Sequence, residues 1–314
     1  MANCQSLFQT YNSNISLTQS KKNRLNISRD GLRNRIKVYF KEYHPEYKPK
    51  FYIQGSRKMG TVIRTKEDIC DLDDGIYFFR NPDVSATVLQ TWVKNAVDGY
   101  TDTNPEHRKK CIRNIFAGDY EIDMPVYYKI DGEEYQLAIK NVGWETSDSK
   151  AVVDWFNGKK DSNGILVKMV KYLKAWCDDK NSIMPNGLAM TILASNVKHR
   201  IVYNKDRDDL SLRDTLKEIK KNLDLKFECV LPVTPNDDLF GSYDEARKEN
   251  FMTALNDFIN DAEAAVKETN QLKSSQLWKK HLGSRFPNGE DKNESATNVG
   301  GLYTLASSSR PFGY

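Results

Sequence analysis

One short segment constrains the fold of this chain more than any other. Residues 71–79 read DLDDGIYFF, with polar and apolar residues alternating in the first half and mostly apolar residues in the second half. Alternation with a period of two is typical of a β-strand, and a continuous apolar run indicates a strand that is covered on both faces. The sequence therefore predicts a sheet in which residues 71–79 form a central strand.

The residues around this strand divide the chain into a strand-rich half and a helical half. Apolar alternation predicts further short strands at residues 51–53, 112–116, 120–128 and 135–139. Apolar spacing near 3.6 residues predicts helices over residues 16–43, 86–97, 164–177, 187–197, 210–225 and 244–267. The end of the chain is rich in Gly, Ser and Asn without periodicity, which predicts a mobile tail.

Composition excludes several classes of protein. The 314 residues carry a formal net charge of +4, well short of the excess expected of a protein that coats nucleic acid. No stretch approaches the roughly 18 consecutive apolar residues of a membrane helix. The first residues lack the pattern of a secretory signal, and the 5 cysteines form no CxxC pair. We therefore expect a cytoplasmic protein without membrane association, disulfide framework or structural zinc site.

Three carboxylates are the strongest candidates for chemistry. Asp71 and Asp73 lie two apart on one predicted strand, so their side chains are expected on the same face. Asp123 lies among apolar residues of a second predicted strand, where a carboxylate is costly unless a cation or hydrogen bonds compensate it. Carboxylates converging from neighbouring strands would hold one or two Mg²⁺ ions. Taken alone, however, the 71–75 segment is equally consistent with an acidic turn before a strand.

The segment upstream of these acids strengthens the interpretation. Gly55 and Ser56 follow a predicted strand and precede the Asp71–Asp73 pair. Glycine permits close backbone approach, and serine offers a hydroxyl and an amide to a phosphate. A strand, a Gly-Ser turn, an Asp-x-Asp strand and a second strand with an acid form a much more specific combination than any one of them.

With these residues the chain resembles the polymerase β-like nucleotidyltransferase superfamily. Within it, the chain is most similar to the bacterial CD-NTases, relatives of cyclic GMP–AMP synthase that act in anti-phage CBASS defence. The resemblance rests on QGSRKMGT at 54–61, DLDDG at 71–75 and IDMPVY at 122–127, and it continues at 170–176, 185–191 and 277–287. It implies an α+β fold: a mixed β-sheet flanked by helices over residues 1–150, a helical domain over 151–288 that completes the nucleotide pocket, and a flexible tail over 289–314.

The resemblance also implies roles for individual residues. Asp71, Asp73 and Asp123 would be the catalytic acids and the ligands of two Mg²⁺ ions, for which Mn²⁺ could substitute. The implied nucleotide-binding residues are Gln54, Gly55, Ser56, Arg113, Lys171 and Asn186. The relatives commonly have Ser at the position of Asn186, whose amide can still hydrogen-bond a phosphate or ribose. Without the resemblance, Lys171 and Arg113 could each belong to a solvated run of surface charge.

The implied activity is synthesis of a cyclic di- or trinucleotide messenger from nucleoside triphosphates such as ATP and GTP, with release of pyrophosphate. An E1–E2-like CBASS partner would act on the C-terminal tail. No DNA activator is expected, because the chain lacks the Cys/His zinc insertion of animal DNA sensors in this family. Two alternatives stay open. A linear oligo- or polynucleotide adenylyltransferase would use the same three acids, and a non-catalytic nucleotide- or RNA-binding module would be expected to have lost some of them.

Overall fold

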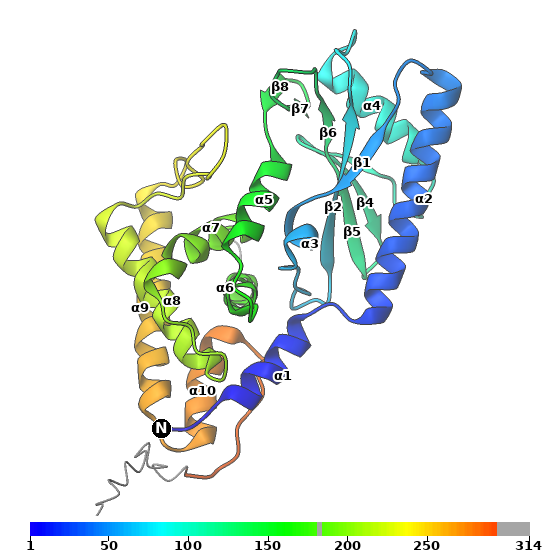
Figure 1. Ribbon diagram of the computed structural model, residues 1–314. Helices are drawn as coiled ribbons and strands as arrows, with labels where there is room; N and C mark the ends of the chain where they lie inside the picture. Colours follow the sequence, from blue (N-terminus) through cyan, green and yellow to red (C-terminus); the bar gives the residue numbers. More distant parts are fainter. Residues whose placement is uncertain (181–183, 294–314) are drawn as a thin grey trace, which may run out of the picture.

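The computed structural model describes residues 1–180 and 184–293, and its sheet is built around the predicted central strand (Figure 1). The α+β expectation is confirmed. The strands are β1 (Lys50–Ile53), β2 (Cys70–Phe78), β3 (Glu106–His107), β4 (Ile112–Phe116), β5 (Tyr120–Met124), β6 (Val126–Tyr128), β7 (Gln136–Ile139) and β8 (Gly143–Thr146). The helices are α1 (Gln5–Ile15), α2 (Gln19–Tyr43), α3 (Gly55–Met59), α4 (Ala86–Val97), α5 (Ser149–Lys159), α6 (Ile165–Lys180), α7 (Gly187–Val197), the 3-10 turn η1 (Lys198–Arg200), α8 (Asp208–Leu225), α9 (Glu245–Lys267) and α10 (Gln271–Leu282).

The sheet is mixed, and β2 has three neighbours along its length. The strand order is β3-β4-β5-β2-β6-β7-β8, with β1 paired to β2 outside this path. The first half of β2 pairs parallel with β5, and its second half pairs antiparallel with β1 and parallel with β6. Because the second half is flanked on both edges and covered on both faces, only a continuous apolar run is stable there. This accounts for the sequence pattern of the segment.

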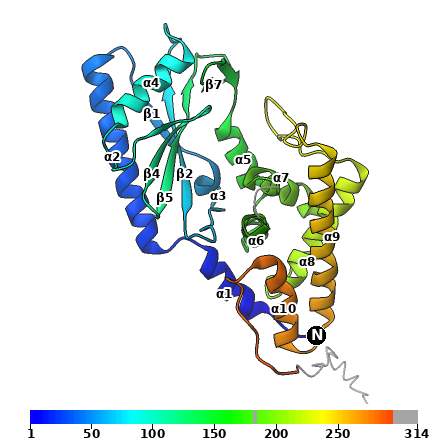
Figure 2. The same cartoon turned by 180° about the vertical axis from the view of Figure 1, so that it is seen from behind.

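Two apolar cores divide the molecule into a sheet layer and a helical layer. In Figures 1 and 2, α2 and α4 lie against the sheet, whereas α5 to α10 form the second layer. The sheet core includes Leu32 and Phe40 from α2. Phe8 and Tyr11 of α1 belong instead to the helical core, where Phe8 packs edge-on against Trp278 of α10. The N-terminal helix thus packs with the C-terminal helices, which differs from the predicted boundary at residue 150.

A buried ion pair fixes β2 to the long helix α2. Asp74 is fully buried, and Arg33 donates to it from Nε to Oδ2 at 2.7 Å and through a second bond from Nη2. A buried carboxylate is tolerated only when a charged partner and hydrogen bonds compensate its desolvation. The third aspartate of the 71–75 segment therefore has a structural role, and it holds the strand that carries the other two.

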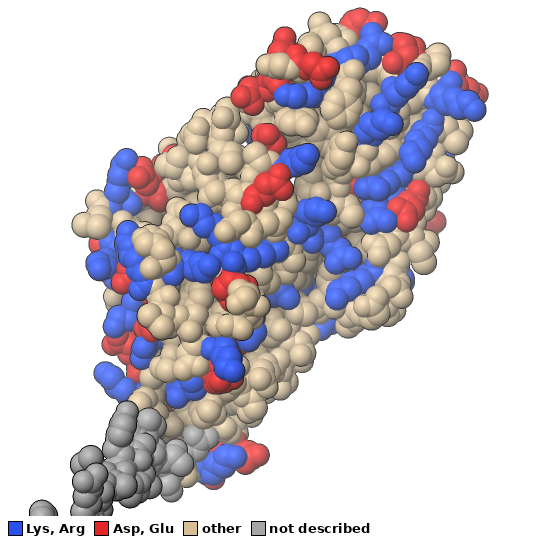
Figure 3. All heavy atoms as spheres, viewed as in Figure 1, with Lys and Arg blue, Asp and Glu red and all other residues tan. Residues whose placement is uncertain are grey.

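Charged side chains of both signs lie on the surface, and the start of the predicted tail contacts a helix. Figure 3 shows Lys and Arg side chains along α2 and across the middle of the molecule, interspersed with acidic ones. No helix in the described part of the chain has both the length and the apolar character to cross a membrane. The first described residues of the predicted tail pack against α10, since Leu272 donates from its backbone to Glu290 at 2.9 Å. Residues 294–314 lie outside the described part.

Candidate active site

A cavity of about 590 Å³ lies between the sheet and the helical layer. One wall carries Asp71, Asp73 and Asp123 from the sheet together with the start of α3. The other walls come from α5, α6, α7 and the loop 231–235. Pockets that bind small ligands and cofactors measure about 300–1,000 Å³, so this cavity is of the size that holds a nucleotide.

The parallel pairing of β2 and β5 places four carboxylates in two rows. Asp73 is registered opposite Asp123, and Asp71 opposite Glu121. Since side chains two residues apart share a face of the sheet, all four side chains lie on the same face. The sequence analysis identified three of these acids and missed Glu121. The same period of two that linked Asp71 with Asp73 could have found it, because Glu121 precedes Asp123 by two residues.

Asp123 pairs with Arg113 of β4, the strand that neighbours β5 on the side away from β2. Arg113 of β4 is registered opposite Asp123, and its Nε and Nη2 donate to Oδ1 and Oδ2 of that carboxylate, each at 2.7 Å. The Nη1 of Arg113 forms an ion pair with Glu121. The sequence analysis assigned Arg113 to the nucleotide. The structure instead brings Arg113 to two of the acids, which an antiparallel neighbour strand makes possible.

The acids nearest the helical layer have strongly perturbed proton affinities. Burial, followed by repulsion from Asp123 and Asp71, raises the pKa of Asp73 to about 6. Burial also raises the pKa of Asp71, which the Arg113 guanidinium partly offsets. Because like charges on neighbouring strands raise the pKa of these carboxylates, a cation that neutralises them is favoured. Lys174 of α6 faces Asp71 and Asp73, and its own burial lowers its pKa to about 8 against their attraction.

The acids fit a divalent cation by donor type and by charge. Within residues 1–180 and 184–293, no three Asp, Glu, His or Cys side chains converge closely enough to hold a metal ion. The predicted three-acid convergence is therefore not realised in this conformation, in which Arg113 engages both oxygens of Asp123. Asp71, Asp73 and Asp123 nevertheless supply the oxygen ligands that Mg²⁺ prefers, on two adjacent strands of one face.

The Gly-Ser turn lies directly against this row of acids. Gly55 has a φ of +52°, and a Cβ atom built on it would lie 2.1 Å from Oδ2 of Asp73. The position therefore requires glycine both for its backbone conformation and for its contact. Ser56 lines the cavity next to it, so the predicted neighbours Gly55, Ser56 and Asp73 are brought together.

Gln54 lines the same cavity, but the sheet uses both ends of its amide. Its Nε2 donates to the Tyr77 hydroxyl at 2.7 Å, and its Oε1 accepts from the Tyr127 hydroxyl at 3.3 Å. The absence of a side chain at Gly75 makes room for it, since a Cβ there would lie 1.7 Å from Nε2. Gln54 therefore holds the start of the Gly-Ser turn, and it stays a prediction as a direct nucleotide contact.

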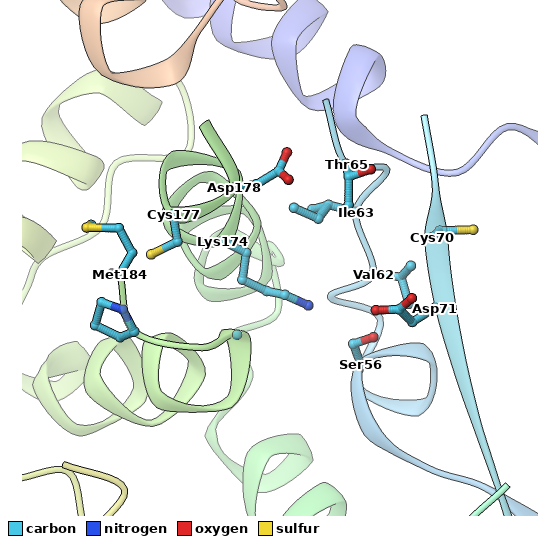
Figure 4. A pocket seen from close by; sticks show the side chains of 12 residues that line it. Ser56, Val62, Ile63, Thr65, Cys70, Asp71, Lys174, Cys177, Asp178 and Met184 are labelled. Carbon is cyan, nitrogen blue, oxygen red and sulfur yellow. The ribbon is translucent and has the colours of Figure 1, made fainter. Parts of the chain in front are cut away.

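A smaller cavity of about 250 Å³ adjoins the first, and half-buried Lys174 of α6 lines it. Figure 4 shows the Lys174 side chain extending from α6 toward Ser56 and Asp71 across this space. Lys171, the predicted phosphate contact, lines neither of these two described cavities, and its Nζ donates to Ser16 Oγ at 3.1 Å. Lys174, one turn further along α6, is the lysine that lines both cavities, and a phosphate contact by Lys171 stays a prediction. Burial lowers the pKa of both lysines.

Asn186 is placed beside the cavities as a helix cap. Its Oδ1 accepts from the Ala189 backbone at 2.9 Å, which satisfies one of the unpaired amides at the start of α7. Its neighbour Gly187 lines both cavities, whereas Asn186 lines neither in the described part of the chain. Its amide nitrogen remains available, so a nucleotide contact by Asn186 stays a prediction.

Comparison with known proteins agrees with this geometry. Residues 49–127, which contain the four acids, Arg113 and the Gly-Ser turn, match the family described as cyclic GMP-AMP synthase DncV-like, nucleotidyltransferase domain. Residues 49–127 therefore match the nucleotidyltransferase domain of a CD-NTase. The resemblance found in the sequence is confirmed by this match and by the relatives it brings.

The chain matches curated relatives over part of their length. The chain is 30% identical over 144 residues to the cyclic GMP-AMP synthase of Escherichia albertii, covering 42% of this chain and 32% of the relative. It is 24% identical over 306 residues to the cyclic GMP-AMP synthase of Vibrio cholerae, covering 77% of this chain and 69% of the relative. The first of these matches thus spans about a third of the relative.

Solved structures share the fold along most of the chain. The crystal structure of Vibrio cholerae DncV in its GTP-bound form superimposes with a TM-score of 0.81 at 20% identity, covering 91% of this chain and 96% of that one. A second structure of Vibrio cholerae DncV, in complex with the linear intermediate 5′ pppA(3′,5′)pG, gives 0.79 at 18% identity, covering 91% and 97%. The chain therefore has the nucleotidyltransferase fold.

The contact between Gly55 and Asp73 yields a direct test. Gly55→Ala requires the Asp73 carboxylate to move by about 1 Å, and misplacement of that size in a site lowers turnover on the order of 100-fold. The matched control is Gly60→Ala, where φ is +77° but no atom lies within 4 Å of the added Cβ. Nucleotide turnover and thermal unfolding are measured for both variants. Equal turnover in both would contradict the importance of this contact.

Proposed function

We propose that this chain is a divalent-cation-dependent synthase that joins nucleoside triphosphates into a cyclic di- or trinucleotide with release of pyrophosphate. The observation that carries the proposal is the row of acids on β2 and β5 beside Gly55 and Ser56, in a cavity of nucleotide size. That V. cholerae DncV has been crystallised with GTP and with a linear dinucleotide intermediate supports the same substrate class for this chain.

The chain's own residues bind and orient the reactants. Ser56 and Lys174 face the adjoining cavities from opposite sides, where they would hold the negatively charged triphosphate. Asp71, Asp73 and Asp123 would hold the divalent cations. When bound, these cations would neutralise charge at the phosphates and acidify the attacking hydroxyl. Gln54 and the Tyr77–Tyr127 pair fix the turn from behind, with the two rings stacked at 4.7 Å.

For a cyclic dinucleotide the reaction proceeds as two nucleotidyl transfers, and a cyclic trinucleotide requires a third. A ribose hydroxyl of one nucleotide attacks the α-phosphorus of another; the new bond joins that oxygen to phosphorus, and the bond to the pyrophosphate oxygen breaks. Asp123 is the residue proposed to activate the hydroxyl, because it lies opposite Asp73 at the cavity wall. The linear product then turns so that its own hydroxyl reaches the remaining triphosphate. A second attack closes the ring.

The wider setting follows the family resemblance and is part of the proposal. The enzyme would act in the cytoplasm in CBASS anti-phage signalling, with ATP, GTP or other triphosphates as substrates. An E1–E2-like partner would act on the tail, whose residues 294–314 lie outside the described part of the structure. DNA is not expected to stimulate activity.

Product analysis tests the activity and separates it from the linear alternative. The chain is incubated with the four labelled nucleoside triphosphates and Mg²⁺ or Mn²⁺, and the products are treated with phosphatase and identified by mass spectrometry. We expect a phosphatase-resistant cyclic product that is lost in the Asp71→Ala/Asp73→Ala variant. A phosphatase-sensitive ladder would indicate a linear transferase. Nucleotide binding without any product would favour a non-catalytic module.

Lys171 and Lys174 of α6 offer a matched pair for the triphosphate site. Lys174→Gln is expected to weaken nucleoside triphosphate binding roughly 10- to 150-fold, because it removes a charge-assisted contact worth about 1.5–3 kcal/mol. Lys171→Gln is expected to change the dissociation constant by less than roughly twofold. Binding is measured by isothermal titration, with thermal unfolding as a check on folding. The reverse order of effects would return the phosphate contact to Lys171.

A further inference from the structure

We propose that Glu121 is a positioning residue that retains Arg113 when Asp123 turns from that arginine toward a divalent cation. Glu121 was not predicted as a site residue from the sequence. The inference rests on the proposed function, since it concerns how the three sheet acids become available to a cation. It follows from the pairing of the Arg113 guanidinium with two carboxylates, those of Glu121 and Asp123.

Asp123 lies between two competing partners on opposite sides of its strand. On one side, Asp73 of β2 is registered opposite it. On the other side, Arg113 of β4 is registered opposite it and engages both of its oxygens at 2.7 Å. A divalent cation shared with Asp73 needs at least one of these oxygens and is repelled by the guanidinium. Cation binding and the bidentate pair therefore compete with one another.

Release of Arg113 would be costly without a second acceptor. The side chains of Arg113 and Asp123 are only 16% and 14% exposed, and breaking such a pair leaves a poorly solvated charge. Glu121, whose side chain is 21% exposed, already pairs with Nη1 of the same guanidinium. Its position two residues before Asp123 on β5 leaves it on the same face and away from Asp73. Arg113 can thus stay bound to β5 while Asp123 changes partner.

The neighbouring charges are consistent with this exchange. Asp71 is registered opposite Glu121, and Lys174 faces Asp71 and Asp73 from α6. Arg108, which precedes β4, pairs with Glu106 at 2.7 Å and is held there in a more exposed position. Among the described residues, Glu121 is therefore the carboxylate that holds Arg113 besides Asp123.

Binding of Mn²⁺ alone to the full chain tests the proposal without relying on turnover. Free Mn²⁺ is measured by electron paramagnetic resonance for the wild type, Glu121→Gln, Arg113→Gln and the double variant. Arg113→Gln is expected to tighten Mn²⁺ binding about tenfold, because it removes a competing cation. Glu121→Gln is expected to weaken binding about fivefold in the wild-type chain, because Arg113 then stays on Asp123, and by less than roughly twofold in the Arg113→Gln chain.

Control variants separate this role from general effects of charge. Glu106→Gln removes a carboxylate from β3 that pairs with Arg108, and it should leave Mn²⁺ binding unchanged. Glu121→Asp keeps the acceptor and should restore part of the affinity. Where thermal unfolding shows that Arg113→Gln does not fold, Arg113→Met replaces it, since methionine also removes the charge and keeps an unbranched side chain.

The possible failures are distinguishable. An equal loss from Glu121→Gln in the wild-type and Arg113→Gln chains would make Glu121 a direct ligand or a long-range charge and overturn the proposal. No loss in either chain would overturn it as well. If the wild type does not bind Mn²⁺ at all, the cation site of the proposed function fails, and the exchange at Arg113 fails with it.

Discussion

The candidate site depends on the parallel register between β2 and β5. That register places Asp73 beside Asp123 and Asp71 beside Glu121 on one face of the sheet. A shift of one residue in either strand would send that strand's acids to the opposite face. The register is held from both sides, because Asp74 is fixed by Arg33 of α2 and the apolar end of β2 is buried among β1 and β6.

Concentrating acids at this point carries an electrostatic cost that the neighbouring elements offset. Arg113 compensates the β5 acids, and Lys174 from α6 faces those of β2. The helical layer therefore contributes a cation beside the acids of β2 and β5. In the proposed reaction Arg113 would give up Asp123 to a divalent ion, and Lys174 would contact phosphate. Substrates and metal would thus replace interactions that stabilise the acids in this conformation.

Much of the fold and part of the site could be predicted from sequence periodicity. The period of two placed Asp71 and Asp73 on one face, and the change to helical spacing after residue 151 separated the layers. The adjacency of β2 and β5 could not be derived from spacing, and it rested on the family resemblance. The resemblance also could not distinguish Lys171 from Lys174, which lie one turn apart on α6. Only the packing of α6 against the sheet shows that Lys174 faces the acids.

Other features depended on tertiary packing that sequence patterns do not encode. The short helix α1 joins the C-terminal helices because Phe8 fits their aromatic core. Gln54 was predicted as a ligand contact, yet the two tyrosines that engage its amide come from β2 and β6. Glu121 was within reach of the sequence analysis, since it alternates with Asp123. Its pairing with Arg113, however, required the position of β4.

The most direct test of this account is to locate bound cations. Crystals of the chain grown with Mn²⁺ and a non-reactive nucleoside triphosphate analogue would be measured at a wavelength that gives anomalous scattering from manganese. The account predicts anomalous density between Asp71, Asp73 and Asp123, with Asp123 turned away from Arg113 and the phosphates beside Ser56. Density elsewhere, or a nucleotide bound with Asp123 still paired to Arg113, would contradict it.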